Sequence, residues 1–313
     1  MKKKVLVLLS SYNGEKFILE QVNSILNQVN VTVKLIIRDD GSTDNTATII
    51  ENLKSPKIKL IYGDNIGCIR SFTQLVISAQ KEYENFDYIA FADQDDIWEA
   101  EKLYAASQLL STLDDTTPNL YFCNMNLVDK DDKHKCFLRS CNLNITKENS
   151  LFGGVAAGCT MVFNKKAVDY YCIKPIESDV YHDYWLYLIC IFWGKVLYDT
   201  NAYIHYRQHE NNVLGLHNRM SYFKRSLDRL KFWFFHTDKI DIQRNRIQKF
   251  YNEFKGDFSD VDKNIIEMYL LHSCNFLGKI KLLLRKGYYP PEAGIIKIKM
   301  IPLFIIKVIL GKI

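Results

Sequence analysis

Short apolar runs alternate with amphipathic stretches along the first hundred residues. The runs predict buried strands at Val5–Leu9, Val33–Ile37, Ile58–Tyr62 and Tyr88–Ala92. Apolar residues at helical spacing predict intervening helices at Glu15–Asn27, Ala47–Leu53 and Phe72–Ala79. Strands that alternate with helices predict an α/β fold, in which a mostly parallel, Rossmann-like sheet is flanked by helices.

The second half of the chain has a different pattern. A strongly aromatic helix is predicted at His182–Phe192, followed by two short strands at Val196–Tyr198 and Ala202–Tyr206. After about Leu216 the strand signals fade, and the remaining sequence is helical, basic and aromatic. We therefore predict a catalytic domain over residues 1–215 and a helical, basic extension over residues 216–313.

Charge divides the chain at the same place. Lys and Arg number 41 against 36 Asp and Glu, but residues 216–313 hold 19 of these bases and only 9 of the acids. With 48% hydrophobic and 25% charged residues, the composition excludes disordered and fibrous proteins. Eight cysteines without a CxxC pair favour buried free thiols over disulfides.

Acidic residues gather where the predicted parallel strands end. Asp93, Asp95 and Asp96 follow one apolar strand, and Asp39 lies at the end of another. Ligands of open α/β sheets bind beyond the carboxyl ends of the strands, and hard divalent cations prefer oxygen ligands. The alternative for each loop is a solvated turn that caps the next helix, and the residues also satisfy that pattern.

Two later segments are further candidates. Asp183, at the start of the aromatic helix, has the position of a general base, although a helix cap explains it equally well. His205 and His209 have a spacing that suits zinc only on a helix, and this segment has the pattern of a strand that leads into a loop. A single His209 joining the acidic cation site is the better interpretation.

Taken together and in order, these signals resemble family 2 glycosyltransferases with the GT-A fold, in a branch that includes rhamnosyl- and hexosyltransferases of bacterial surface-polysaccharide assembly. The resemblance runs from about residue 4 to 215. The residues that carry it are Ser11-Tyr12-Asn13-Gly14, Asp39-Asp40-Gly41-Ser42-Thr43-Asp44, Asn65-Ile66-Gly67, Asp93-Gln94-Asp95-Asp96-Ile97-Trp98, Gly158-Cys159-Thr160-Met161, His182-Asp183-Tyr184-Trp185 and Tyr206-Arg207-Gln208-His209.

The resemblance implies a role for each motif. Tyr12 would stack on the nucleotide base, Asp39 would hydrogen-bond it, and Asp93 would contact the ribose. The metal, Mg²⁺ or Mn²⁺, would be held by Asp95 with Asp93 and His209. The wider family more often has Glu-Asp where this chain has His182-Asp183. Because this variant is familiar in the polysaccharide branch, the catalytic base would be Asp183, with His182 the lesser candidate. The remaining donor-binding candidates are Ser11, Asn13, Asn65, Arg70 and Gln94.

The implied activity is metal-dependent, inverting transfer from dTDP-rhamnose or a UDP-hexose to a lipid-linked saccharide. The tail fits this activity, because residues 271–313 interleave eight Lys and Arg with apolar residues and contain one acid, Glu292. Such a segment suits an anionic membrane surface, which predicts a cytoplasmic protein peripheral to the inner face of the cell membrane. The alternatives are a helical subdomain packed on the catalytic domain, a nucleic-acid-binding protein and an inactive scaffold. Nucleic acid is not the expected partner, because no known binding motif accompanies the basic tail.

Overall fold

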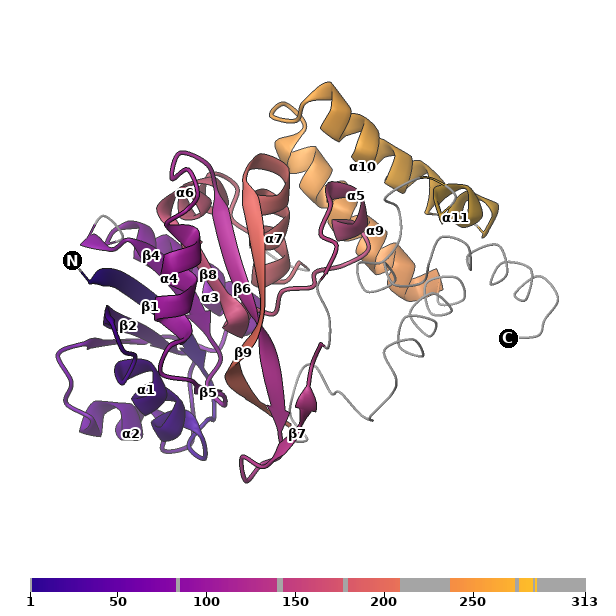
Figure 1. Cartoon of the computed structure of the whole chain (residues 1–313). Helices are drawn as coiled ribbons and strands as arrows, with labels where there is room; N and C mark the ends of the chain where they lie inside the picture. The colour runs from indigo at the N-terminus through magenta and orange to yellow at the C-terminus, as the bar shows by residue number, and fades with distance from the viewer. Residues whose placement is uncertain are drawn as a thin grey trace. The chain divides into compact units, whose positions relative to one another are not determined.

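The computed structural model describes residues 2–82, 85–139, 143–176, 180–208, 237–273, 276–283 and 285. The chain divides into two compact units, which Figure 1 shows with their elements labelled. Unit 1 comprises Met1–Cys141 and Ala156–His217, and unit 2 comprises Asn142–Val155 and Asn218–Ile313.

One sheet organises unit 1, with the strand order β3-β2-β1-β4-β8-β6-β9-β5 and β7 paired with β6. Its parallel part joins β2 to β1 and β3, and β1 to β4, while β8 lies antiparallel between β4 and β6. The strands are β1 (Lys3–Ser11), β2 (Val31–Asp39), β3 (Ile58–Tyr62), β4 (Tyr88–Ala92), β5 (Ile97–Trp98), β6 (Asn119–Val128), β7 (His134–Phe137), β8 (Met161–Asn164) and β9 (Lys195–Arg207).

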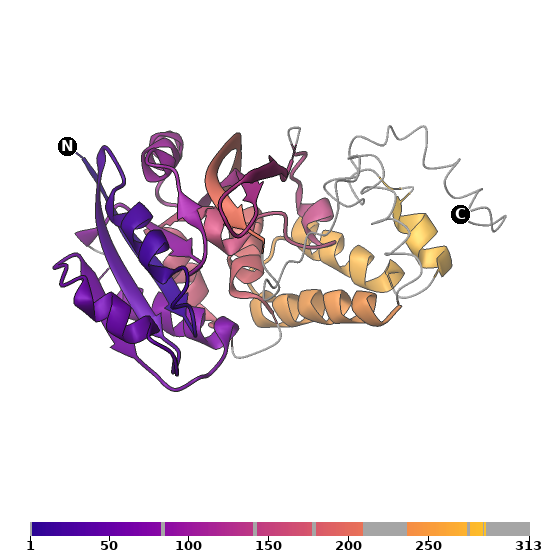
Figure 2. The ribbon, with the colours of Figure 1, turned by 90° about the horizontal axis from the view of Figure 1, so that it is seen from below.

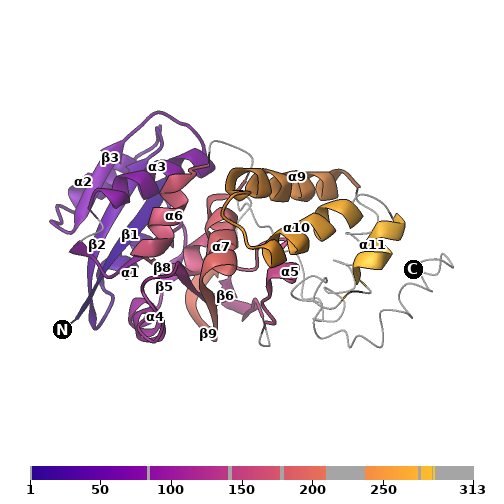
Figure 3. The same ribbon diagram turned by 90° about the horizontal axis from the view of Figure 1, so that it is seen from above.

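Helices cover both faces of this sheet, as predicted. Figure 3 shows α3 (Cys68–Gln80), α6 (Lys165–Ile173) and α7 (His182–Trp193) side by side over one face. Helices α1 (Ile18–Leu26) and α4 (Lys102–Leu110) pack on the other, and α2 (Thr46–Asn52) lies beside α1. The N-terminal strand and α1, both indigo, lie close together in Figure 2. The five apolar residues Val5–Leu9 are fully buried, as expected for a strand with helices on both faces.

One predicted boundary is wrong. The two short strands expected at Val196–Tyr198 and Ala202–Tyr206 form one strand, β9, which runs from Lys195 to Arg207. The polar residues between them do not end the strand, because its pairing with β6 shifts register near Cys123 and Asn124. This irregularity accommodates the extra residues while the pairing continues on both sides.

Unit 2 is helical in its described parts, as predicted for the C-terminal region. Its helices are α5 (Lys147–Ser150), α9 (Thr237–Phe254), α10 (Asp260–His272) and α11 (Phe276–Leu283). Phe250 packs against Phe254 and Phe258, and an ion pair of 2.7 Å joins Lys147 to Asp262. No helix among the described residues is long and apolar enough to span a membrane. Most of the predicted membrane-contacting segment, residues 286–313, lies outside the described residues.

Pairing in parallel brings the strand ends of unit 1 to one edge. Ser11 is opposite Asp39, Asp39 is opposite Tyr62, and Leu9 is opposite Ala92. The loops that follow β1, β2, β3 and β4 therefore start at the same edge of the sheet, which is the edge where ligands of such sheets bind.

Candidate active site

A cluster of acidic groups forms where β4 ends. Asp93 and Asp96 place carboxylate oxygens within 4.8 Å of each other and of the Cys159 thiol, a geometry that is able to hold a metal ion. Asp93 and Asp95 are half-buried, whereas Asp96 is 1% exposed. The loop is held in place by Gln21 of α1, whose side-chain amide donates to the main-chain carbonyl of Asp93 at 2.8 Å.

Burial and neighbouring carboxylates raise the pKa values of Asp93 and Asp96, although the charge of Lys102 acts in the opposite direction. Burial, followed by the charges of Asp95 and Asp183, raises the pKa of Asp93 to about 7. Both carboxylate oxygens of Asp96 are buried, and no N–H or O–H group in the described part of the chain donates to them; the Cys159 thiol, a weak donor, lies beside them. Lys102 is fully buried nearby, but its ammonium lies 3.1 Å from the centroid of the Trp98 ring, and burial lowers its pKa to about 8.

A divalent cation fits this donor set. Buried carboxylates that repel one another are neutralised when a cation binds them, and carboxylate oxygens suit Mg²⁺ or Mn²⁺. The thiol of Cys159 is a softer group, and burial raises its pKa well above the usual range, so it stays protonated. Asp96 and Cys159 both belong to motifs that the sequence pointed to, but neither was predicted as a metal ligand, whereas Asp93 was.

Asp183 lies in the first turn of α7. The main-chain N–H of Gly158 donates to one of its carboxylate oxygens at 3.1 Å, and the N–H of Tyr184 donates to the other at 2.6 Å. Gly158 permits this approach, since a Cβ there would lie 3.0 Å from the ring of His182. The carboxylate is therefore fixed in direction and half-buried, and its charge also acts on Asp93.

His182 is poorly suited to act as a base. Its ring stacks on Phe72 with centroids 3.9 Å apart and meets Phe91 edge-on at 4.9 Å. Neither ring nitrogen has a hydrogen-bond partner within the described ranges, and burial lowers the pKa of the ring to about 3. His182 is 5% exposed and its imidazole stays neutral, whereas Asp183 is half-buried.

The loops after β1 and β2 are tied to one another and to the acidic loop. Two hydrogen bonds join Tyr12 to the side-chain amide of Gln94. The Tyr12 main-chain N–H donates to Gln94 Oε1 at 2.9 Å, and Gln94 Nε2 donates to the Tyr12 main-chain carbonyl at 3.0 Å. Asn13 accepts from the Thr43 N–H at 2.8 Å. Tyr12 keeps 44% of its surface exposed, which leaves the ring accessible at the sheet edge.

Asp39 lies behind these loops and is almost fully buried. Its carboxylate accepts from the Ser42 N–H at 2.8 Å, the Ser42 hydroxyl at 2.6 Å and the Ser11 hydroxyl at 3.2 Å. Ser11 is itself 1% exposed, so its side chain acts on Asp39 and not on solvent.

The loop after β3 converges on the same region. Asp40, paired with the guanidinium of Arg38, accepts from the Gly67 N–H at 2.9 Å. Asn65 accepts from the same N–H at 3.2 Å. Cys68, at the start of α3, is exposed by its surface area, yet desolvation of its thiol, followed by the charges of Asp93, Asp183 and Asp40, raises its pKa to about 12. Arg70, in the first turn of α3, is exposed.

Two histidines near the end of β9, His205 and His209, were considered as metal ligands in the sequence. His205 lies on β9, as the strand pattern predicted, and its ring nitrogens contact carboxylates of Asp132 at 2.8 Å and Glu99 at 2.7 Å. These contacts occupy both nitrogens, which disfavours a zinc site at this histidine. His209, the predicted metal ligand, lies outside the described residues.

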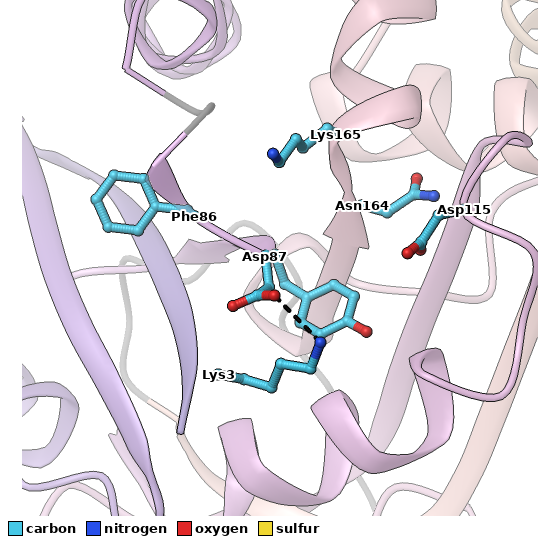
Figure 4. Close-up of a pocket in the computed structure, with 7 residues that line it drawn as sticks. Lys3, Phe86, Asp87, Asp115, Asn164 and Lys165 are labelled. Carbon is cyan, nitrogen blue, oxygen red and sulfur yellow. Dashed lines mark hydrogen bonds and ion pairs between the residues drawn. The ribbon is translucent and has the colours of Figure 1, made fainter. Parts of the chain in front are cut away.

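A pocket of about 220 Å³ lies at the opposite edge of the sheet, near the first residues of β1 and β4 (Figure 4). Among its charged lining residues, the Lys3 ammonium contacts the Asp87 carboxylate at 3.1 Å. The lining residues are Lys3, Phe86, Asp87, Tyr88, Asp115, Asn164 and Lys165. None of the predicted site residues belongs to this pocket.

Known proteins share this combination of fold and motifs. The family model described as glycosyl transferase family 2 matches residues 6–172, more than half of the chain. The chain belongs to glycosyl transferase family 2. This confirms the family that the motifs indicated.

Similar proteins agree with the family. The chain is 33% identical over 231 residues to dTDP-rhamnosyl transferase RfbG of Shigella flexneri, covering 66% of this chain and 73% of the relative. It is 25% identical over 199 residues to UDP-Glc:alpha-D-GlcNAc-diphosphoundecaprenol beta-1,3-glucosyltransferase WfgD of Escherichia coli, covering 63% and 71%. The solved structure of S. aureus TarS 1-349 with UDP-GlcNAc matches with a TM-score of 0.56 at 16% identity, covering 98% of this chain and 92% of that chain. This likeness confirms the predicted GT-A fold.

Proposed function

We propose that this glycosyltransferase moves rhamnose from dTDP-rhamnose, or a hexose from its UDP donor, to a lipid-linked saccharide, with inversion and with a divalent cation. One observation carries the proposal. Carboxylates from the loop after β4 and from α7 converge at the carboxyl edge of the sheet, where Asp93 has a pKa of about 7 and Asp96 is buried with no N–H or O–H group of a described residue donating to it. The names of RfbG and WfgD support the two donor classes.

In this proposal, the loops at the sheet edge bind the donor. Tyr12 stacks on the nucleotide base, and Asp39, oriented by Ser11, accepts a hydrogen bond from it. Asp93 contacts the ribose and joins Asp95 and His209 in holding Mg²⁺ or Mn²⁺, with Asp96, whose carboxylate lies within 4.8 Å of that of Asp93, as a further ligand. Arg70 lies near the phosphates. Asn13, Asn65 and Gln94 shape the loops through the hydrogen bonds that they make.

Asp183 acts on the acceptor in the proposed reaction. An acceptor hydroxyl is a weak nucleophile, so a carboxylate positioned beside it removes its proton as the hydroxyl attacks the anomeric carbon. Two main-chain N–H groups orient Asp183 for this task and His182 packs behind it without ionising. A cation bound at the acidic loop supplies charge stabilisation to the departing diphosphate. Direct attack by the hydroxyl, with a single base, inverts the anomeric centre.

The acceptor and its place in the cell belong to the same proposal. WfgD is named for a diphosphoundecaprenol acceptor, and this supports a lipid-linked saccharide of surface-polysaccharide synthesis. The basic, apolar sequence of residues 271–313 supports contact with the anionic inner face of the cell membrane. Full-length protein is expected to sediment with anionic vesicles at low salt and to leave them at high salt. Equal sedimentation with neutral vesicles would contradict electrostatic contact.

The donor assignment is tested with a panel of UDP- and dTDP-sugars. Calorimetry with and without Mn²⁺ measures binding, and release of the nucleoside diphosphate measures slow hydrolysis. We expect one donor class to bind tightly only with Mn²⁺ and to be hydrolysed slowly. A chain that binds no nucleotide sugar under either condition would contradict the proposed function.

A further inference from the structure

Arg207 ends β9 and has almost no contact with solvent. The residue is 4% exposed, and it lies two positions before His209 in the sequence. The motif at the end of β9 includes this arginine, but neither the resemblance nor the proposed chemistry uses it.

The guanidinium joins three parts of unit 1. Its Nε donates to the main-chain carbonyl of Asp95 at 3.0 Å, and Nη1 donates to the carbonyl of Lys130, in the turn between β6 and β7, at 3.2 Å. The Nη2 group contacts the carboxylate of Glu20 on α1. The planar group also lies over the ring of Phe17, 4.9 Å from its centroid.

These contacts bear on the direction of the Asp95 side chain. The peptide group that follows the Asp95 Cα is planar, so a hydrogen bond to its oxygen restrains rotation about the ψ angle of Asp95. This restraint limits how far the main chain is able to turn the Asp95 side chain away. Only a fork of N–H donors reaches the Asp95 and Lys130 carbonyls and Glu20 at once, and a lysine ammonium cannot reproduce it. Glu20 also balances the charge of Arg207, so the guanidinium leaves the acidic loop able to attract a cation.

We propose that Arg207 is a positioning residue for the divalent cation: it fixes the main chain of Asp95 and joins it to the strand that leads to His209. This inference rests on the proposed function, because Asp95 is a metal ligand only under that proposal. Groups that orient metal ligands without touching the metal typically affect metal affinity by about 10- to 100-fold when they are removed.

The test measures the binding of Mn²⁺ to full-length Arg207→Lys and Arg207→Gln by electron paramagnetic resonance, with UDP or dTDP present. We expect both variants to bind Mn²⁺ about 10- to 100-fold more weakly than the wild type. Arg207→Lys keeps the positive charge and most of the stem, so it remains informative if Arg207→Gln fails to fold.

Arg244→Lys is the matched control. The Nε of Arg244 also donates to a main-chain carbonyl, that of Leu270 at 3.2 Å, but in unit 2. We expect this variant to bind Mn²⁺ like the wild type. A folded Arg207→Lys chain with wild-type Mn²⁺ affinity would overturn the role of Arg207 alone. Absence of Mn²⁺ and nucleotide binding in the wild type would overturn the proposed function as well.

Discussion

Two aspartates flank the same strand, and their environments are opposite. Asp87 precedes β4, where the Lys4 N–H donates to it at 2.8 Å and the Lys3 ammonium at 3.1 Å. Burial acts to raise the pKa of Asp87, but these hydrogen bonds outweigh burial and lower it. Asp93 follows β4, where burial and the charges of Asp95 and Asp183 raise its pKa to about 7.

This difference distinguishes the edge of the sheet where the carboxylate of Asp87 is paired within the chain from the edge where we propose that the donor and the cation bind. At the amino edge, where β1 and β4 begin, the Lys3 ammonium is the cation beside Asp87, so this carboxylate is stabilised without a ligand. At the carboxyl edge, acidic groups face one another, and a buried arrangement of this kind costs stability unless something neutralises it. The cost is understandable if a cation and a nucleotide sugar bind there.

The largest expected effect is at Asp95. Asp95→Ala removes a proposed metal ligand, so metal-dependent turnover should fall by roughly 1000-fold or more. The measurement is release of nucleoside diphosphate in Mn²⁺ with the donor that the panel identifies. Full activity in the variant would remove the functional distinction between the two edges.

Asp183→Asn is expected to lose turnover while it keeps the donor. Loss of a general base costs roughly 100- to 10,000-fold in rate, whereas the residue has no proposed contact with the nucleotide. Turnover and calorimetric donor affinity should therefore separate in this variant. If both fall together, Asp183 has a different role.

His182→Phe tests the other buried ionisable group at this edge. The folded histidine stays neutral down to a pH of about 3, whereas in the unfolded chain it gains a proton below about 6.5. Protonation of the unfolded chain therefore lowers stability as pH falls, by ~2 kcal/mol at pH 5. Phenylalanine does not ionise, so the His182→Phe variant does not lose this stability as pH falls. The free energies of unfolding in urea of the two proteins should therefore diverge between pH 8 and pH 5. Parallel pH dependences would contradict the neutral, buried state of His182.

The smallest effect is expected at the amino edge. Asp87→Asn removes an ion pair whose side chains are 41% and 37% exposed. Such pairs contribute at most about 1 kcal/mol, so unfolding should change by no more than this and turnover should stay near wild type. A large loss of turnover would show that the pocket in Figure 4 takes part in the reaction.

Strand positions in the first hundred residues were predictable because local pattern decides them. Ile58–Tyr62 and Tyr88–Ala92 have the predicted bounds, since each is an apolar run between polar turns. Pattern failed at β9, where polar residues interrupt the run but a register shift against β6 keeps the strand continuous.

The acidic loops were also visible in the sequence, but their chemistry depends on distant contacts. The burial of His182 comes from Phe72 and Phe91, and Cys159 reaches Asp93 and Asp96 only in the folded sheet. Arg207 contacts a loop 112 residues earlier in the chain. Spacing along a sequence contains no signal for such pairs, so the motif marked this arginine without indicating its partner.

The most direct test of the account compares the two edges in one titration. Calorimetry follows the binding of UDP and dTDP, with and without Mn²⁺, to the wild type, Asp93→Asn and Asp87→Asn. The account predicts that Mn²⁺ strengthens nucleotide binding in the wild type and in Asp87→Asn, and that Asp93→Asn loses most of this gain. An undiminished Mn²⁺ effect in Asp93→Asn, or an equal loss in Asp87→Asn, would contradict a cation site at the carboxyl edge.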